Sequence, residues 1–287
     1  MRISRDWNEY ELLDASGGER LERWGSVTLI RPDPQVIWNT EKRDPRWQSA
    51  DARYIRSASG GGHWEYRREL PPFWEIKYKD LKFKISPTGF KHTGLFPEQA
   101  VNWDWMRGKI SGAGHDVRVL NLFAYTGGAT LAAAAAGASV CHVDAAKGMV
   151  KWARENSDLS GLSARPVRWI VDDCAKFVER EIRRGSLYDA VILDPPSYGR
   201  GPAGEVWKLE DQIYDLMELC AGALTEDPLF VLLNGYTTGL SASTMAYVLG
   251  VTMKRFGGRV SADEIGLPVK ASGLPLPCGC SAVWEKD

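Results

Sequence analysis

The sequence contains no run of about 18 apolar residues, so it lacks the signature of a membrane-spanning helix. Residues 1–20 also lack the apolar segment of a secretion signal, which predicts a cytoplasmic protein. The five cysteines and four histidines form no C-x-x-C pair and no metal-ligand spacing. We therefore expect neither a disulfide framework nor a bound metal. The formal net charge is only −1, which neither requires nor excludes a nucleic-acid partner, because a local basic face can coexist with it.

The 287 residues suffice for two ordinary domains, and the texture of the chain changes near residue 88. Up to that point, short strand-like runs alternate with turns at glycine and proline, a pattern typical of a small β-rich domain. We predict such a domain over residues 1–88, as a candidate for substrate recognition, and a second domain over residues 89–287. No feature indicates a homodimer, and none excludes one.

One run in the first domain is rich in lysine. Residues 76–85, IKYKDLKFKI, read as a single strand with Lys77 and Lys79 on one face and Lys82 and Lys84 on the other. Two interpretations stay open. The run either contacts a phosphate backbone beside aromatic neighbours, or forms a solvated sheet edge guarded by lysines.

The chain is organised around residues 117–144, VRVLNLFAYTGGATLAAAAAGASVCHVD. Residues 117–123 read as a buried strand, and a turn containing Gly127 and Gly128 leads into an alanine-rich helix. Gly137 ends that helix as a C′ glycine, and residues 138–143 form the next buried strand. This strand, glycine turn, helix and strand make up the first half of a nucleotide-binding α/β fold.

An acid closes this unit. Asp144 follows the second strand, where it can accept hydrogen bonds from both ribose hydroxyls of a nucleoside. The loop is not the G-x-G-x-x-G of dinucleotide enzymes, so it suits a smaller, uncharged link better than a pyrophosphate. Adenosine joined to methionine fits that description. The alternative is that two glycines and an acid only close a βαβ crossover.

Polar residues also follow the later predicted strands. Asp172 and Asp173 follow residues 167–171, Asp194 follows residues 188–193, and Asn234 follows residues 229–233. Because parallel strands end at one edge of a sheet, these side chains are expected to meet there. We expect Asp173 or its backbone to bind an adenine edge and Asp194 to orient the acceptor. The rigid Pro195-Pro196 turn follows Asp194, and Tyr198 is a candidate for stacking on a flipped base.

Several segments in this order resemble class I S-adenosylmethionine-dependent methyltransferases, specifically the bacterial 23S rRNA group that includes cytosine-C5 and guanine-N7 enzymes. The matching segments are KHTGLFPEQ (91–99), VLNLFAYTGG (119–128), WAREN (152–156), Asp172-Asp173 and DAVILDPPSY (189–198). The resemblance implies an α/β fold with a Rossmann-like seven-stranded sheet, in which five parallel strands are closed by an antiparallel hairpin near residues 259–265 and 280–284. It also implies S-adenosyl-L-methionine as the cofactor and ribosomal RNA as the partner.

The resemblance further implies where the cofactor lies: over the glycine loop, with Phe96 and Gln99 helping to enclose it. The candidate cofactor-binding residues are Phe96, Gln99, Asn121, Phe123, Tyr125, Thr126, Gly127, Gly128, Asp144, Ala145, Asp172, Asp173 and Asp194. The candidate catalytic residues are Asp194, Pro195, Pro196, Tyr198 and Asn234.

The sequence departs from the cytosine-C5 pattern at residues 234–238, where that group carries a cysteine. The loop here has none, nor does the Asp194-Pro-Pro-Ser turn, and asparagine stands where the guanine-N7 relatives place it. We therefore predict methylation of a base nitrogen, because carbon 5 requires a thiolate nucleophile. The alternatives are a methyltransferase with a non-RNA substrate and a non-catalytic nucleic-acid-binding protein that retains the cofactor pocket.

Overall fold

The computed structural model describes residues 1–57, 61–200, 206–236 and 240–287. It divides into two compact units, each discontinuous in sequence. The first unit consists of Met1–Val101 and Gly266–Cys278, and the second of Asn102–Ile265 and Gly279–Asp287. The division into functional domains at residue 88 stays a prediction.

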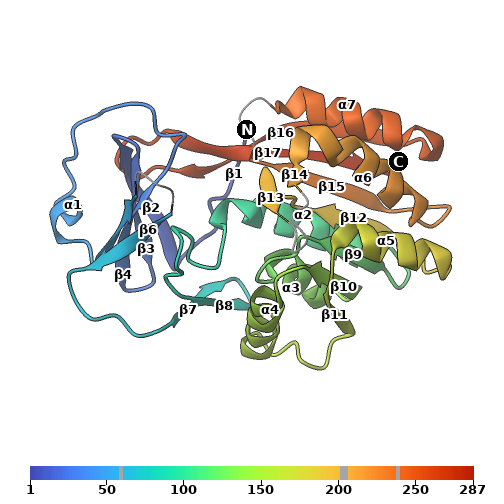
Figure 1. Cartoon of the computed structure of the whole chain (residues 1–287), viewed down its shortest axis with the longest axis horizontal. Helices are drawn as coiled ribbons and strands as arrows, with labels where there is room; N and C mark the ends of the chain where they lie inside the picture. The colour runs from blue at the N-terminus through green and yellow to red at the C-terminus, as the bar shows by residue number, and fades with distance from the viewer. Residues whose placement is uncertain (58–60, 201–205, 237–239) are drawn as a thin grey trace. The chain divides into compact units, whose positions relative to one another are not determined.

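The second unit is built on five parallel strands in the spatial order β11, β10, β9, β12, β15 (Figure 1). Their bounds are β9 (Arg118–Leu122), β10 (Ser139–Asp144), β11 (Val167–Val171), β12 (Ala190–Leu193) and β15 (Phe230–Gly235). Next to β15 lies the antiparallel β17 (Pro275–Glu285), and then β16 (Arg259–Pro268). These seven strands confirm the expected methyltransferase sheet. A two-residue eighth strand, β1 (Arg2–Ile3), adjoins β16.

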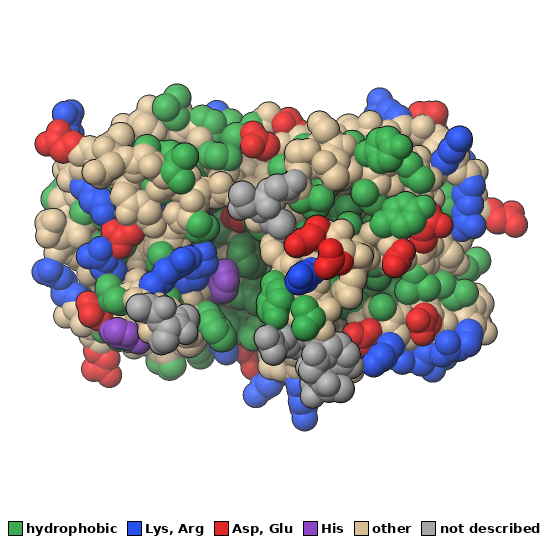
Figure 2. Space-filling model, turned by 45° about the horizontal axis from the view of Figure 1, so that its top comes forward, with side chains coloured by type: hydrophobic (Ala, Val, Ile, Leu, Met, Phe, Trp, Pro, Cys, Tyr) green, Lys and Arg blue, Asp and Glu red, His purple; other side chains and the backbone are tan. Residues whose placement is uncertain are grey.

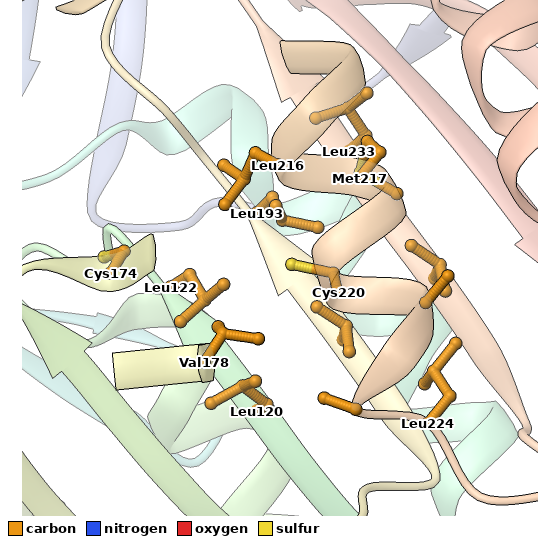
Figure 3. Close-up of a cluster of buried hydrophobic side chains, with 14 of the residues drawn as sticks. Leu120, Leu122, Cys174, Val178, Leu193, Leu216, Met217, Cys220, Leu224 and Leu233 are labelled. Atoms are coloured by element: carbon orange, nitrogen blue, oxygen red, sulfur yellow. The ribbon is translucent and has the colours of Figure 1, made fainter. Parts of the chain in front are cut away.

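Three helices cover one face of this sheet: α5 (Cys174–Arg183), α6 (Leu209–Gly222) and α7 (Ala242–Thr252). Leucines of β9, β12 and β15 point toward them and form a continuous apolar core, in which Val178 of α5 and Met217 of α6 are fully buried (Figure 3). Strands buried on both faces read as near-continuous hydrophobic runs, which is why they were predictable.

Three further helices belong mainly to the second unit: α2 (Ala100–Ser111), α3 (Gly128–Ala135) and α4 (Lys147–Leu159). Gly137 has φ +103° just beyond α3, which confirms its place as the C′ glycine. Pro97 opens a short 3₁₀ turn, η1 (Pro97–Gln99), directly before α2.

The first unit contains a five-stranded sheet and a separate hairpin, which confirms its β-rich character. The sheet runs in chain order: β2 (Tyr10–Ser16), β3 (Glu19–Trp24), β4 (Val27–Pro32), β5 (Ala52–Arg56) and β6 (Gly62–Tyr66). A single turn of helix, α1 (Arg46–Ser49), connects β4 to β5.

The single lysine-rich strand expected over residues 76–85 was wrong. The chain folds back at Lys79, which has φ 53°, so that β7 (Trp74–Tyr78) pairs with β8 (Leu81–Ile85). Burial then switches parity: Ile76 and Phe83 face the interior, while Lys77 and Lys82 are cross-strand neighbours on the outer face. The turn contains neither glycine nor proline, so the usual signal for a hairpin was missing.

Candidate active site

The loop between β9 and α3 has an unusual backbone. Phe123 and Tyr125 have φ values of 53° and 50°, in the left-handed region that only a few per cent of non-glycine residues adopt. Hydrogen bonds hold this conformation: Ala124 N–H donates to Val143 O at 3.1 Å, and Gly127 N–H donates to Ala124 O at 3.0 Å. A strained loop that neighbouring strands fix in this way is typical of a ligand site.

Asp144 fixes the same loop with its side chain. One carboxylate oxygen accepts from Tyr125 N–H at 2.9 Å and the other from Ala146 N–H at 2.8 Å. Partial burial raises the pKa of this carboxyl group, and the two backbone donors oppose that shift. An ionised carboxylate has about four acceptor positions, so each oxygen can accept a further bond from a ribose hydroxyl. The carboxylate therefore fits the nucleoside part of the cofactor.

The two glycines of the loop are required by helix packing. A Cβ on Gly128 would lie 2.5 Å from the Trp103 ring, and one on Gly127, where φ is +87°, would lie 3.0 Å from Ala153. Behind them Asn156, of the WAREN segment, donates to the carbonyl of the buried Thr126 at 2.8 Å. Helix packing alone therefore explains why both positions are glycine. Close approach of their backbone to a ligand stays a prediction.

Asn121 lies beneath the loop and is buried. Its amide donates to Thr130 Oγ1 at 2.9 Å, and Thr130 Oγ1 lies 2.9 Å from His142 Nδ1. This chain of contacts joins β9, α3 and β10 on the sheet face opposite α5–α7, since strand residues alternate between faces. Burial lowers the pKa of His142 to about 3, which favours a neutral imidazole that accepts the Thr130 proton.

The end of β11 adjoins that of β10. Asp172 N–H donates to Asp144 O at 3.1 Å, and the Asp172 carboxylate pairs with Arg180. Asp173 is exposed and caps α5, where its carboxylate accepts from Lys176 N–H at 2.9 Å. Both acids therefore have structural partners at the edge where the sequence placed them.

The first residues of α5 and of the glycine loop are also in contact. The Phe123 N–H donates to Cys174 Sγ at 3.3 Å, and Cys174 is buried. Burial raises the pKa of this thiol. Ala145, by contrast, is exposed after Asp144.

The DPPSY segment lies beside the glycine loop. Asp194 N–H donates to Leu122 O at 3.4 Å, which places Asp194 at the end of β12 next to the end of β9. Pro195 is buried and Pro196 exposed. The Pro196 carbonyl accepts from the Trp207 indole at 2.6 Å.

Trp207 belongs to a small hairpin that the sequence did not reveal. It consists of β13 (Tyr198–Arg200) and β14 (Val206–Lys208), and Tyr198, opposite Lys208, is 52% exposed. The Trp207 ring lies 5.6 Å from that of Phe123, so the hairpin packs on the glycine loop. Strands of three residues are too short to show a periodic pattern of apolar residues, so the sequence did not predict them.

Asn234, the residue before the last in β15, belongs to a buried polar cluster. Its Oδ1 accepts from Asn102 Nδ2 at 3.0 Å and from the Ser281 hydroxyl at 2.6 Å, and all three side chains are at most 2% exposed. This cluster ties α2 and β17 to the end of β15. Residues 237 and 238 of the expected catalytic loop lie outside the described residues.

Phe96 and Gln99 belong to the first unit. The Phe96 carbonyl accepts from Gln99 N–H at 3.1 Å, and the Phe96 ring lies 5.4 Å from that of His92. Burial lowers the pKa of His92 to about 4 and raises that of the neighbouring Glu98, which is 3% exposed. The segment is well packed, and its contact with the cofactor stays a prediction.

The described residues lack two further features. They contain no group of three or more His, Cys, Asp or Glu that could hold a metal ion. No helix in the same ranges is long and apolar enough to cross a membrane. Acidic and basic side chains are interspersed on the face shown in Figure 2.

Comparison with known proteins bears on this arrangement directly. Residues 45–221 match the family model described as S-adenosylmethionine-dependent methyltransferase. The crystal structure of the SAM-dependent methyltransferase from Agrobacterium tumefaciens is 37% identical, with a TM-score of 0.93 over all of this chain and 93% of that one. A putative methyltransferase, SMU.776, solved with SAH, shares the fold at 19% identity, with a TM-score of 0.75 over 98% of this chain and 76% of that one.

Among curated proteins, the chain is similar to ribosomal RNA large subunit methyltransferase K/L. Identity is 36% over 119 residues with the protein of Shewanella sp. (strain MR-4), and 38% over 118 residues with that of Pseudoalteromonas translucida (strain TAC 125). Each match covers 41% of this chain but only 16% of the relative. Since the family model covers more than half of the chain and the Agrobacterium structure matches all of it, this protein belongs to the S-adenosylmethionine-dependent methyltransferase family.

Proposed function

We propose that this methyltransferase modifies a base of ribosomal RNA in the cytoplasm, and that the acceptor atom is a nitrogen, more specifically one of guanine. The ribosomal RNA assignment is supported by the similarity to the K/L enzymes, which covers 41% of this chain. The nitrogen assignment is supported by the cysteine thiols, because burial raises the pKa of each of them. This observation carries most weight.

In this proposal, residues at the ends of different strands bind different parts of the cofactor. Asp144 accepts the ribose hydroxyls, Asp173 or the adjacent backbone meets the adenine edge, and Phe96 and Gln99 enclose the cofactor. When bound, S-adenosylmethionine supplies an electrophilic methyl group on its sulfonium sulfur. The residues of this chain have to hold the acceptor in line with that methyl group, about 3 Å away.

Asp194 is proposed to hydrogen-bond the acceptor base. The Pro195-Pro196 turn, fixed by the Trp207 hydrogen bond, keeps Asp194 and the carbonyls after it in place. Tyr198, which is half exposed on β13, is proposed to stack on the base. Asn234, near the end of β15, is proposed to help Asp194 place the base by hydrogen bonding.

Methylation at carbon 5 of cytosine requires a thiolate that first adds to carbon 6. All five cysteines are within the described residues, and burial raises the pKa of each thiol, to about 11 for Cys141 and about 12 for Cys220. Raised pKa values keep thiols protonated near neutral pH, so no cysteine is prepared as a nucleophile. A ring or exocyclic nitrogen can react without one.

Cys280 is the thiol to examine first. It lies opposite Gly235, at the end of the strand whose loop carries the cysteine in the C5 group, and it is partly exposed. Burial and the nearby Glu264 raise its pKa, which argues against a thiolate there. Cys280→Ser should therefore retain methyl transfer within a few-fold.

The decisive experiment measures transfer of labelled methyl groups to ribosomal RNA, compared with protein and small-molecule acceptors. Modified RNA is then digested and its nucleosides identified by mass spectrometry. N-methylguanosine is the expected product. Finding 5-methylcytosine, or a covalent complex with RNA containing 5-fluorocytosine, would overturn the nitrogen assignment. Loss of activity in Cys280→Ser would then identify Cys280 as the nucleophile. Transfer only to protein or small molecules would overturn the RNA assignment.

A further inference from the structure

The first unit carries a shallow pocket of about 420 Å³ that has no part in the proposed methyl-transfer site. Six residues line it: Tyr66, Glu69, Leu70, Pro71, Pro72 and Pro87. Its volume lies within the range of roughly 300–1,000 Å³ that is usual for small ligands. The lining is mostly apolar, with one carboxylate.

The pocket has rigid walls. Tyr66 ends β6, where its pairing with Ala52 of β5 fixes the backbone. Proline rings restrict φ on the other sides, and the Ser86 hydroxyl donates to Pro72 O at 2.8 Å, joining the Pro72 wall to the segment that carries Pro87. A ligand would meet a surface that needs little ordering on binding.

Three aromatic rings in the stretch of chain that carries the pocket are largely exposed: Tyr66, which lines it, Phe73, which follows Pro72, and Phe90, three positions after Pro87. Tyr66 is 53% exposed, Phe73 45% and Phe90 67%. Exposed large rings that cluster in one region usually mark an interaction site. Flat rings beside a pocket of this size suit a flat, aromatic ligand.

The surrounding charge is positive. Residues 61–92 contain seven Lys and Arg against four Asp and Glu, a net charge of +3, although the whole chain is at −1. Lys84 Nζ lies 4.8 Å from the centre of the Phe73 ring, so a cation and an exposed ring stand together next to Pro72. Positive charge interleaved with aromatic rings favours a polyanion that carries flat groups, which describes single-stranded nucleic acid.

We propose that this pocket binds one unpaired nucleobase of the RNA substrate, stacked on Tyr66, from a nucleotide other than the one that is methylated. The inference rests on the proposed function. Glu69 accepts a hydrogen bond from an exocyclic amino group, so the pocket favours cytosine, adenine or guanine over uracil. Lys84 interacts with the adjoining phosphate.

Binding of fluorescent single-stranded RNA decamers to the full chain tests this inference by anisotropy. Tyr66→Ala should weaken binding roughly 5- to 150-fold, the loss expected for one stacked base, while Tyr66→Phe stays near wild type. The matched control is Tyr247→Ala, because Tyr247 is 75% exposed on α7 in the second unit. Circular dichroism confirms that each variant is folded.

Two further variants separate the contacts. Oligocytidine should bind about 2- to 12-fold more tightly than oligouridine, and Glu69→Gln should remove that preference. Lys84→Gln should lower the slope of log affinity against log salt by about 1, whereas Tyr66→Ala leaves the slope unchanged.

The outcomes are distinguishable. If wild type binds and methylates RNA but Tyr66→Ala behaves like Tyr247→Ala, the pocket inference is wrong and the proposed function stands. If wild type neither binds nor methylates RNA, both are wrong. Equal loss on every RNA with an altered salt slope in Tyr66→Ala would show an electrostatic effect, and would also contradict stacking.

Discussion

The backbone N–H of Tyr125 donates to the Asp144 carboxylate at 2.9 Å, so the acid assigned to the ribose also holds the strained glycine loop. Asp144→Ala should weaken S-adenosylmethionine binding at least about tenfold, because two charge-assisted bonds of about 1.5–3 kcal/mol each are lost. Calorimetry measures the change. The matched control is Asp189→Ala, since Asp189 accepts from Arg118 N–H at 2.7 Å, where β12 begins and not where it ends. Equal affinities in the two folded variants would contradict the ribose assignment.

Asp194 provides a test that separates binding from chemistry. Asp194→Ala should leave cofactor affinity within a few-fold and strongly reduce kcat, because the carboxylate is assigned to the acceptor. Steady-state kinetics combined with calorimetry checks this. Loss of cofactor binding with kcat intact at saturation would reverse the two roles.

The cluster of Asn234, Asn102 and Ser281 predicts a shared effect on stability. Asn234→Ala and Ser281→Ala should each lower the free energy of unfolding by about 1–3 kcal/mol, because each leaves buried polar partners unsatisfied. Denaturant unfolding measures this loss. If Asn234 also touches the acceptor, its variant should lose much more kcat than Ser281→Ala at a temperature where both are folded. Equal kcat values would restrict Asn234 to a structural role.

His142 should make the protein sensitive to acid. Its pKa falls from an ordinary value of 6.5 to about 3 on folding, so between these values the unfolded chain binds a proton that the folded chain does not. The free energy of unfolding should therefore decrease as the pH falls below 6.5, by up to about 1.4 kcal/mol per unit, until the pH approaches 3. This contribution is absent above pH 6.5, where both states are neutral.

Urea unfolding at several pH values tests the His142 prediction. The slope of stability against pH should be shallower in His142→Gln than in wild type, while His115→Gln, at an exposed position, should keep the wild-type slope. Identical slopes in all three proteins would show that another group causes the acid sensitivity.

The parallel sheet was predictable because its strands are continuous apolar runs and each ends at a polar residue. The same pattern identified Asp144 and Gly137 from local sequence. It failed at Lys79, where only a change in the parity of buried positions marks the turn. It also missed α7, because the apolar residues of this helix surround it and do not form one stripe. The N-cap residue of α7, Ser241, is clear in the structure.

The polar cluster at Asn234 shows a different limit. Asn102 and Ser281 are 132 and 47 positions away from Asn234 in the chain, so no local pattern connects them. Trp103 illustrates the same point, because the need for glycine at position 128 arises from a ring 25 positions earlier that only the fold brings close. The sequence motif predicts where the site lies, but long-range packing decides which structural contacts several of its residues make.

The discontinuous first unit has a consequence for synthesis of the protein. Its residues Leu12 and Leu13 accept backbone hydrogen bonds from Lys270 and Ala271, both at 3.0 Å, and Ser4 donates to Gly266 at 3.0 Å. A ribosome adds roughly 5–20 residues per second, so these partners emerge many seconds after residues 1–101. All five parallel strands of the second unit are made in the interval. The first segment, residues 1–101, therefore stays incompletely paired until the ribosome has made residues 266–278.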